Sequence, residues 1–422
     1  MLAQWLDYLE QLHPQAIAMG LERVLRVKLA LALEIGCPVI TVGGTNGKGS
    51  CCAMLEAMLL HAGYRVGCYT SPHLLRYNER VRIGGREVDD DLLCRAFERI
   101  EAARNEQTGG TLLTYFEFGT LAALLAFAEA KIEIAILEVG LGGRLDAVNA
   151  FDADCSIVVS VDLDHQNYLG HTRDAIGFEK AGIFRRDRPA VCADADPPAT
   201  LIDHAGEIGA RLMLIDRDFG FSAEPAQWSY WGPGGKRHGL PYPALRGACQ
   251  LANAAACLAA LDALRERVPV TAQDIRGGLL QADISGRFQV LAGRPQVILD
   301  VAHNPLAARV LAANLATMPK SARVIAVFAM LKDKDIAGVA AAVKDRITHW
   351  LVAPAEGPRG ATAQHLAAEL QHAGVTAPVE RFDDVAGAWR AACQIAADND
   401  KIIAFGSFLT VAAVMCERQR KV

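Results

Sequence analysis

The chain has 422 residues, of which 52% are hydrophobic and 22% are charged, and its formal net charge is −5. This length predicts two or three domains, and the composition is typical of a globular α/β protein with large cores. The weakly acidic balance, without a basic block or an apolar run long enough to span a bilayer, argues against nucleic acid and membrane as partners.

Helical patterns occupy the first 36 residues. The start of the chain has acidic residues and no apolar core, so it does not resemble a signal peptide, and we expect a cytoplasmic protein. The 11 cysteines lie mostly in apolar contexts and form no CxxC pair, which predicts reduced thiols. For the adjacent Cys51 and Cys52, helix packing is favoured over the alternative of a reactive thiol.

A glycine-rich turn lies between a predicted strand over Val39–Val42 and a predicted helix over Ser50–Ala62. Strand, glycine turn, lysine and helix start form the arrangement that surrounds a nucleotide phosphate, because glycines let backbone N–H groups turn inward and Lys48 adds a cation. We therefore predict ATP binding here. The generic motif is broken at Val42 and Gly49, and a flexible turn is the alternative. The segment reads Gly43-Gly44-Thr45-Asn46-Gly47-Lys48-Gly49-Ser50.

Strand and helix signals continue to alternate after this turn. The continuous apolar runs at 134–139 and 155–161 are typical of strands buried in a parallel sheet. With a strand at 65–69 and helices over 90–104 and 117–131, they predict a P-loop-type, mainly parallel sheet with helices on both faces. Residues 217–247, rich in Trp, Tyr and Gly, predict a short antiparallel excursion.

Two side chains follow buried strands at the sheet edge where ligands of open α/β sheets bind. Glu138 ends one strand and is well placed to hold Mg²⁺ or to orient a water, whereas a salt-bridged strand-end glutamate is the alternative. His165 follows the next strand and can ligate a metal through one ring nitrogen. A lone histidine is more often structural, but its place on the same edge as Glu138 favours the metal.

A glycine-rich loop over 141–147 carries Arg144 and Asp146, which we expect to form a buried pair that closes over a substrate or simply makes a turn. Lys180, in Glu179-Lys180-Ala181-Gly182, reads as a cation on a helix surface. An ammonium has no lone pair and cannot ligate Mg²⁺, although a carbamate on the same side chain could.

A second α/β series begins after Arg287, and we place the domain boundary between residues 288 and 289. Strands are predicted at 296–300, 323–328, 349–353 and 401–405, which indicates a smaller Rossmann-like domain. Asp300 ends the first of these strands, where a carboxylate commonly accepts ribose hydroxyl hydrogen bonds. His303 could reach phosphate, and the guanidinium of Arg287 suits phosphate charge. Each could instead be a turn or cap residue.

In order along the chain, these segments resemble the folylpolyglutamate synthase/dihydrofolate synthase family within the Mur ligase superfamily. Gly49, which spoils the generic phosphate loop, belongs to this family's own form of the motif. The resemblance covers nearly the whole chain and rests on residues 44–50, 70–74, 78–81, 113–118, 138–146, 179–184, 300–305, 331–335 and 406–408.

The resemblance implies a role for each matching residue. An N-terminal segment near Gln15–Ala18 would close the pterin pocket, although Ala18 stands where family members often have an acidic residue. Residues 1–288 would form the ATP-binding domain with the pterin pocket, and residues 289–422 the glutamate-ligase domain. The implied ligands of the ATP phosphates are Thr45, Asn46, Gly47, Lys48, Gly49 and Ser50. The implied Mg²⁺ ligands are Ser71, Glu138, His165 and a carbamylated Lys180.

The resemblance also implies that adenosine and phosphate are bound from the second domain by Asn253, Arg287 and Asp300, with His303 nearby. The residues implied to line the pterin pocket are Thr114, Tyr115, Phe116, Glu117, Leu145, Asp146 and Ala147.

The implied activity is ATP-dependent addition of L-glutamate to dihydropteroate and to reduced folates, through an acyl phosphate, by a bifunctional monomer. A peptidoglycan-type Mur ligase is a rival, but only 42 residues precede Gly43, which we expect to be too few for a UDP-sugar domain. A regulatory ATP-binding module is a second rival. It would need fewer functional groups than Glu138, His165, Lys180 and Asp300 together.

Overall fold

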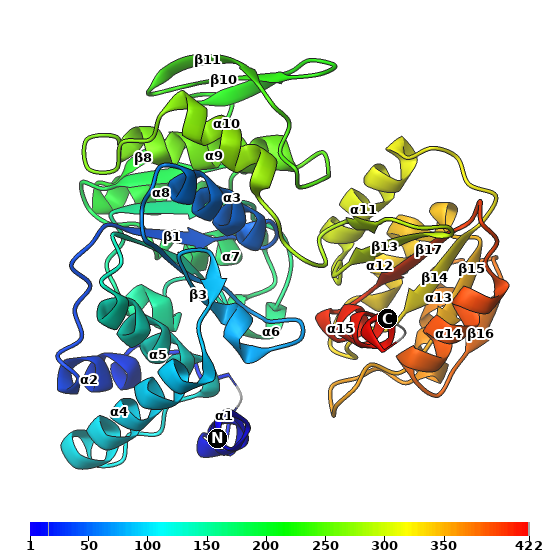
Figure 1. Ribbon diagram of the computed structural model, residues 1–422, viewed down its shortest axis with the longest axis horizontal. Coiled ribbons are helices and arrows are strands. Elements are labelled where there is room, and N and C mark those ends of the chain that lie inside the picture. Colours follow the sequence, from blue (N-terminus) through cyan, green and yellow to red (C-terminus); the bar gives the residue numbers. More distant parts are fainter. Residues whose placement is uncertain (16, 421–422) are drawn as a thin grey trace. The chain divides into compact units, whose positions relative to one another are not determined.

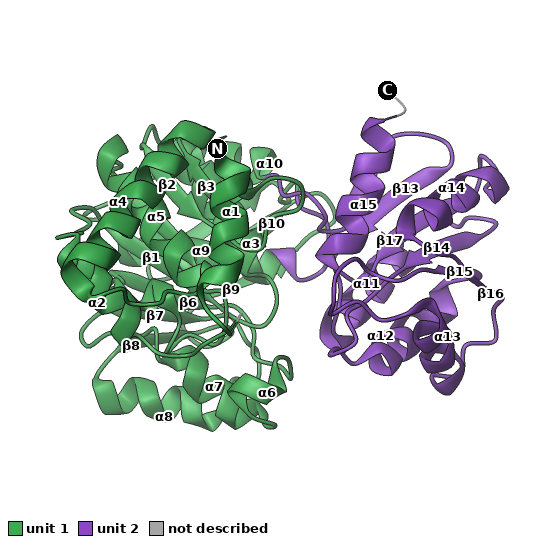
Figure 2. Cartoon of the chain, turned by 90° about the horizontal axis from the view of Figure 1, so that it is seen from below, with its two compact units in different colours: residues 1–244, 251–282 green, residues 245–250, 283–422 purple. Residues whose placement is uncertain are grey.

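A computed structural model describes residues 1–15 and 17–420 of the chain. The described chain divides into two compact units (Figure 2): unit 1 comprises Met1–Ala244 and Leu251–Ala282, and unit 2 comprises Leu245–Gln250 and the chain from Asp283 onward. The short segment Leu245–Gln250 is fastened to unit 2 by Ala248, whose backbone N donates to Asn314 Oδ1 at 3.3 Å.

Unit 1 is built on an eight-stranded sheet with the order β4-β3-β2-β5-β1-β6-β7-β8. Figure 1 labels β1, β3 and β8 of this sheet. The central strand β1 (Val39–Gly43) pairs in parallel with β5 (Ile134–Glu138), with Val42 opposite Glu138, and with β6 (Cys155–Val158). Every residue of these three strands is buried, because continuous apolar runs are covered on both faces of the sheet. The remaining strands are β2 (Val66–Tyr69), β3 (Val81–Ile83), β4 (Arg86–Glu87), β7 (Pro189–Cys192) and β8 (Arg211–Leu214), of which β3 and β4 are antiparallel to their neighbours.

Helices cover this sheet and extend unit 1. The helix after the phosphate loop begins at Lys48, two residues before its predicted start. The helices of unit 1 are α1 (Leu2–Leu12), α2 (Glu22–Ala30), α3 (Lys48–His61), α4 (Asp90–Thr108), α5 (Tyr115–Ala130), α6 (Gln166–Leu169), α7 (Arg173–Ala181), α8 (Ala199–Ile208), α9 (Gln250–Ala263), whose first residue groups with unit 2, and α10 (Ala272–Gln281), with 3-10 turns η1 (Tyr77–Arg80) and η2 (Ala147–Ala150).

The predicted antiparallel excursion is a three-stranded sheet of β9 (Gly220–Ala223), β10 (Trp228–Gly232) and β11 (Gly235–Leu240). Trp228 and Tyr230 of β10 are buried, and the Tyr230 hydroxyl donates to Asp262 Oδ2 of α9 at 2.8 Å. The small sheet is therefore fixed to α9 by a polar contact as well as by packing.

Unit 2 contains a six-stranded sheet with the order β12-β13-β17-β14-β15-β16. Its core includes the rings of Phe328, Trp350 and Phe405, whose centroids lie 4.9 to 5.9 Å apart. The sheet is parallel except for β12, and both units match the expected α/β class. The elements are β12 (Gln289–Leu291), β13 (Gln296–Asp300), β14 (Val324–Phe328), β15 (His349–Val352), β16 (Val379–Arg381), β17 (Lys401–Phe405), α11 (Pro305–Thr317), α12 (Ile336–Val343), α13 (Ala363–His372), α14 (Val385–Ile395), α15 (Phe408–Gln419) and the 3-10 turn η3 (Lys344–Arg346).

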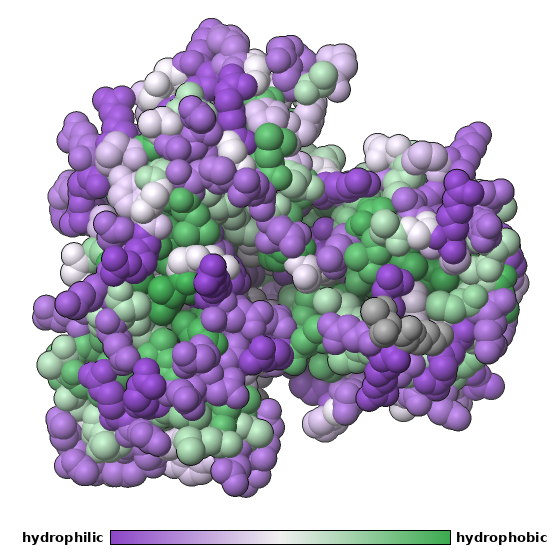
Figure 3. Space-filling model, viewed as in Figure 1, coloured by the Kyte–Doolittle hydropathy of each residue, from purple (hydrophilic) through white to green (hydrophobic). Residues whose placement is uncertain are grey.

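The face drawn in Figure 3 mixes polar and apolar residues over both units. Within the described residues, no helix combines the length and the apolar character that crossing a membrane requires.

Candidate active site

The phosphate loop joins β1 to α3 in a backbone form that requires glycine. Gly44 and Gly47 have φ values of 146° and 87°, and a Cβ on Gly47 would lie 2.7 Å from Val159 Cγ1. The loop is held from the β6 side, where Thr45 N donates to Ser160 O at 2.7 Å and Asn46 N donates to Ser160 Oγ at 3.1 Å. Close backbone approach and positive φ together form a cradle that side chains would fill.

The start of α3 is open to an anion. The N-cap residue Gly47 has no side chain to cap this helix end, and the first N–H groups of an α-helix point away from it toward a possible acceptor. Lys48 Nζ donates to the loop carbonyls of Gly44 at 3.0 Å and Thr45 at 3.4 Å, which keeps the ammonium against the loop. A helix N-terminus beside a cation and a glycine cradle fits the phosphates of a nucleotide.

Ser71 and Glu138 meet at the same sheet edge. Glu138 ends β5, is 3% exposed, and accepts a hydrogen bond from Ser71 N, which follows β2, at 3.0 Å. His165 lies beyond β6 with φ of 51°, and its backbone N donates to Asp164 Oδ1 at 2.8 Å. Because β2, β5 and β6 are near neighbours in one sheet, their carboxyl ends bring the three expected ligands to one edge.

These residues fit a metal that arrives with a nucleotide rather than one held by the protein alone. No group of three or more His, Cys, Asp or Glu suited to a metal occurs in the described part of the chain. The expected set contains two residues of these types, Glu138 and His165. Mg²⁺ commonly keeps several waters and takes one or two protein carboxylates together with substrate phosphates. A sparse donor set beside a phosphate cradle matches that chemistry.

Lys180 lies inside the protein and is not a surface cation. The residue is 3% exposed on α7, and its pKa is lowered to about 7 by burial and by the nearby Lys48 charge, against the carboxylates of Asp164 and Asp146. A large fraction of this amine is therefore uncharged near neutral pH. A neutral amine is a nucleophile, which is the form that a carbamate requires.

The glycine-rich loop after β5 packs directly on α7. A Cβ on Gly143 would lie 2.8 Å from Glu179 O and 3.0 Å from Lys180 O, so this glycine permits the approach. The expected pairing of Arg144 with Asp146 is wrong, because Arg144 Nη2 lies 2.8 Å from Glu179 Oε1 instead. The ion pair therefore ties the loop to the turn of α7 that carries Lys180.

Asp146 is buried and holds the backbone of its own loop. It accepts hydrogen bonds from Leu141 N at 2.8 Å and Val148 N at 3.1 Å, and burial raises its pKa to about 7. Leu145 O accepts from Gly20 N at 3.5 Å, and Ala147 begins η2. The segment Leu145–Ala147 thus lies beside the chain near Gly20. Of the expected closing segment, Ala16 lies outside the described residues.

The four residues of the Thr114–Glu117 segment have two different roles in the structure. Thr114 and Glu117 form a capping box at the start of α5, and Arg23 Nη2 lies 2.9 Å from Glu117 Oε1. Both side chains are buried and engaged in protein contacts. The rings of Tyr115 and Phe116 are partly exposed and are the members with apolar surface for a planar ligand.

Three neighbours of the aromatic members were not assigned a role from the sequence. Arg80 lies over the rings of Tyr77 and Tyr115, with 5.4 Å from Cζ to each centroid, and its Nε donates to His73 Nδ1 at 2.8 Å. Burial and the Arg80 charge lower the pKa of His73 to about 4, so its ring is neutral at pH 7. His73 and Arg80 belong to segments that carry the family resemblance, but nothing in their spacing indicated this cluster.

Asn253 lies in unit 1, although we expected it to act from the second domain. It is 3% exposed on α9, and a Cβ on Gly47 would lie 3.1 Å from its Oδ1, which places the amide against the phosphate loop. Cys51 Sγ donates to Asn253 O at 3.8 Å. Cys51 and Cys52 are fully buried in α3 and burial contributes to raising the pKa of both thiols, in agreement with helix packing.

The second-domain residues gather within unit 2. Asp300, at the end of β13, accepts hydrogen bonds from Phe288 N at 2.8 Å and Ala302 N at 2.7 Å, and burial raises its pKa despite the nearby Arg287. Arg287 Cζ lies 4.9 Å from the Phe408 ring centroid, and the His303 ring lies 6.3 Å from the same ring. Unit 2 therefore brings Arg287, Asp300 and His303 together around one aromatic side chain.

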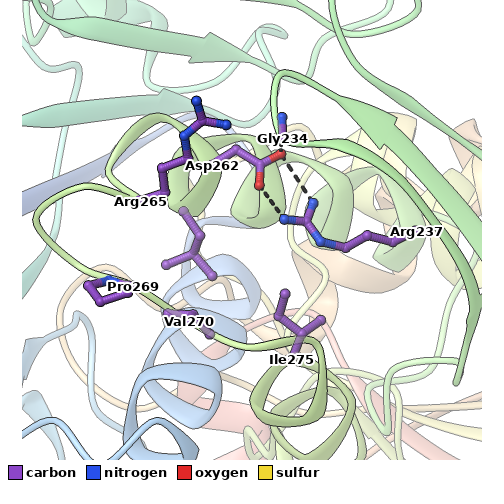
Figure 4. Close-up of a pocket in the computed structure, with 8 residues that line it drawn as sticks. Gly234, Arg237, Asp262, Arg265, Pro269, Val270 and Ile275 are labelled. Atoms are coloured by element: carbon purple, nitrogen blue, oxygen red, sulfur yellow. Dashed lines mark hydrogen bonds and ion pairs between the residues drawn. The ribbon is translucent and has the colours of Figure 1, made fainter.

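A separate cavity of about 210 Å³ lies between α9, α10 and the three-stranded sheet (Figure 4). Its acidic group, Asp262, is 6% exposed and accepts from Tyr230 Oη at 2.8 Å, Gly234 N at 2.9 Å and Arg237 Nη1 at 3.2 Å. These bonds join the sheet to α9 and occupy the carboxylate. The cavity is a structural junction and not the centre described above.

Comparison with known proteins gives concordant results. Residues 42–261 match the Mur ligase middle domain, and residues 286–408 match the Mur ligase glutamate ligase domain. The dihydrofolate synthase/folylpolyglutamate synthase of Escherichia coli strain K12 is 47% identical over 415 residues, covering 98% of this chain and 94% of that protein. The protein of the same description from Haemophilus influenzae is 40% identical over 432 residues, covering 97% and 96%.

Solved structures agree with these relatives. A structure described as E. coli FolC in complex with DHPP and ADP matches with a TM-score of 0.93 and 45% identity, covering 100% of this chain and 98% of that chain. A bifunctional folylpolyglutamate synthase/dihydrofolate synthase with Mn, AMPPNP and L-glutamate bound matches with a TM-score of 0.91 and 48% identity, covering 99% and 98%. The chain therefore belongs to the Mur ligase family, among its dihydrofolate synthase/folylpolyglutamate synthase members.

Proposed function

We propose that this chain is an ATP-dependent ligase that joins L-glutamate to dihydropteroate, forming dihydrofolate, and to reduced folates, forming folylpolyglutamates. The observation that carries the proposal is the convergence of the phosphate loop, the Ser71–Glu138 pair and buried Lys180 at one end of the unit 1 sheet. The relatives named above supply the substrate class, since their descriptions include DHPP, L-glutamate and a nucleotide.

The reaction begins with attack of the substrate carboxylate on the γ-phosphorus of ATP, which forms an acyl phosphate and releases ADP. The glutamate amine then attacks the acyl carbon and phosphate leaves. We propose that the phosphate loop, through residues 45–50, and Asn253 position ATP, while Lys48 neutralises charge on the transferring phosphoryl group. Unit 2 would contribute Arg287, Asp300 and His303 to the same reaction.

Ser71, Glu138 and His165 would hold Mg²⁺, and a carbamate on Lys180 would add one anionic oxygen ligand. The metal would neutralise phosphate charge when bound. The Lys180 amine is buried and its pKa is lowered to about 7, so the neutral form that this modification requires is available near neutral pH. Exclusion of water from the active site would protect the acyl phosphate from hydrolysis.

The pterin pocket is proposed from Thr114 to Glu117 and from Leu145 to Ala147. Tyr115 and Phe116 would supply apolar ring surface, while Thr114, Glu117 and Asp146 would hold the pocket in shape through the hydrogen bonds described above. We also propose that the enzyme acts as a monomer, with one copy of each substrate site per chain. The domain assignment, 1–288 for ATP and pterin and 289–422 for glutamate ligation, is part of this proposal.

The test is ADP release by the full chain with Mg·ATP and L-glutamate. Turnover with 7,8-dihydropteroate establishes dihydrofolate synthase activity, and turnover with tetrahydrofolate establishes chain extension. Activity on tetrahydrofolate alone contradicts bifunctionality but leaves the ligase chemistry intact. Silence with both pteroyl substrates contradicts the proposal, provided that the protein is folded by circular dichroism.

A further inference from the structure

Arg80 carries a charge that the protein itself does not neutralise. Its guanidinium is partly buried against the edge-to-face pair of rings formed by Tyr77 and Tyr115, at 5.4 Å from Cζ to each centroid. Its Nε donates to His73 Nδ1 at 2.8 Å, so the outer edge with both Nη groups is left for another partner. Across residues 1–15 and 17–420, no carboxylate forms an ion pair with Arg80.

The neighbouring arginines behave differently. Arg23 Nη2 lies 2.9 Å from Glu117 Oε1, and Arg82 Nη2 lies 2.7 Å from Glu56 Oε2. The carboxylate next to Arg80 in sequence is also occupied, because Glu79 accepts backbone hydrogen bonds from residues 74, 75 and 76 at 2.6 to 2.7 Å. A partly desolvated guanidinium without a counter-ion is costly unless something binds it.

Arg80 lies between the two parts of the proposed site. On one side its carbonyl accepts from Thr70 N at 2.9 Å, and the next residue, Ser71, donates to Glu138. On the other side its guanidinium stacks on Tyr115, the residue after the Thr114 cap. Arg80 therefore links a ring of the proposed pterin pocket to the chain segment that carries Ser71 and contacts Glu138.

We propose that Arg80 binds the carboxylate of the pteroyl substrate, the group that becomes the amide. The inference rests on the proposed function and adds a binding residue to it. The two Nη groups of a guanidinium match the two oxygens of a carboxylate, and the contact with the two rings restricts the side chain at low entropic cost. Arg80 would then align the acceptor before phosphoryl transfer.

The test compares an acid with its amide. Binding of 7,8-dihydropteroate and of 7,8-dihydropteroate carboxamide, which lacks the charge, is measured by calorimetry with Mg·ADP present for wild type, Arg80→Gln and Arg80→Lys. A charge-assisted pair predicts that the wild type prefers the acid by about 10- to 100-fold. Arg80→Gln should abolish the preference, and Arg80→Lys should retain part of it.

Arg76→Gln is the matched control. Arg76 lies on the same loop, its side chain is 63% exposed, and it faces Glu87 and Asp90 at 3.8 and 3.5 Å. This variant should keep the full preference for the acid. An equal loss of affinity for acid and amide in Arg80→Gln would assign Arg80 a purely structural role and overturn the inference.

Two further outcomes separate the possible failures. If Arg80→Gln raises KM for L-glutamate and leaves dihydropteroate binding unchanged, Arg80 holds the carboxylate of the incoming amino acid, and the inference is overturned. If wild type neither binds nor turns over dihydropteroate, the dihydrofolate synthase part of the proposed function fails. Wild-type turnover without any preference for the acid overturns the inference alone.

Discussion

Arg23 and Glu117 form a two-pronged ion pair across 94 residues of sequence, with Nη2 2.9 Å from Oε1 and Nε 3.2 Å from Oε2. The same carboxylate accepts from Thr114 N at 2.8 Å to complete the cap of α5. Glu117 is 3% exposed. Its contacts join α5 to the start of α2, so Glu117 positions the aromatic residues beside it.

Glu117→Ala should therefore reduce the stability of the fold more than it reduces the rate of the catalysed reaction. The variant leaves Arg23 without its counter-ion and removes the cap, which predicts a loss of about 3 kcal/mol in the free energy of unfolding. Urea unfolding measures it. Glu129→Ala is the control, since its pair with Arg95 is about half exposed and should change stability by less than about 1 kcal/mol. Equal losses in the two variants would contradict this role.

Gly47→Ala should impair nucleotide binding. Gly47 has φ of 87°, and an added Cβ would meet Val159 Cγ1 at 2.7 Å and the Asn253 amide at 3.1 Å. Gly63, after the other end of α3, has the same φ with nothing within 4 Å, so Gly63→Ala isolates the cost of the backbone conformation, about 1–2 kcal/mol. We expect KM for ATP to rise about tenfold or more in Gly47→Ala only. Similar ATP kinetics in both variants would count against the cradle.

Lys180→Met should stabilise the protein at pH 7 in CO₂-depleted buffer. Because the folded pKa of Lys180 is lowered to about 7 from the ordinary 10.5, the unfolded chain binds more protons between these pH values, and stability rises as pH rises. Below about pH 7 the amine is protonated in both the folded and the unfolded state, so the folded protein bears the full cost of the buried charge and stability no longer changes with pH. Removing the amine should therefore gain on the order of 2–4 kcal/mol at pH 7 and less at pH 9, as measured by urea unfolding. A gain independent of pH would contradict the buried amine.

Activity should depend on CO₂ if Lys180 is carbamylated. We expect wild-type ADP release to fall in CO₂-depleted buffer and to recover with bicarbonate, while Lys180→Ala stays inactive in both. Incorporation of ¹³C-bicarbonate, followed by ¹³C NMR, should be absent from Lys180→Ala. Full activity of a folded Lys180→Ala protein would refute the modification.

Asp300→Ala should weaken unit 2 locally. The change leaves the N–H groups of Phe288 and Ala302 without their acceptor, and each buried unsatisfied group costs about 1–3 kcal/mol. Hydrogen exchange should show faster opening around 286–302 together with a raised KM for ATP. Asp333→Ala removes a largely exposed pair with Arg359 and should do neither. If hydrogen exchange around residues 286–302 is unchanged in Asp300→Ala, Asp300 does not stabilise this part of unit 2.

The sequence predicted those parts of the fold that depend on local pattern. The apolar runs at β1, β5 and β6 are strands, and Gly44 and Gly47 of the phosphate loop take positive φ. Strand ends could be placed at one edge because parallel strands share a direction, which put Glu138 at that edge. Ser71, which donates to Glu138 there, was indicated by the family resemblance alone.

Long-range pairing was beyond reach from one sequence. Arg144 pairs with Glu179 rather than with Asp146, two residues away, because the loop folds onto α7. The burial of Lys180 had a weak signal, since it follows the buried Ile176 by four residues on the same helix face. The position of Arg80 against two rings had none, because Tyr115 comes from the start of α5, far from Arg80 in sequence.

The short segment Leu245–Gln250 restricts how unit 2 can be truncated or exchanged. It is separated in sequence from the rest of unit 2 by α9 and α10, yet Ala248 is bonded to Asn314, and Gly247, with φ of 128°, leaves no room for a Cβ beside the same amide. A fragment beginning at residue 283 would lack this piece. Unit 2 is therefore not contiguous in sequence, and transferring it to a relative requires two exchanges that preserve the fit at Asn314.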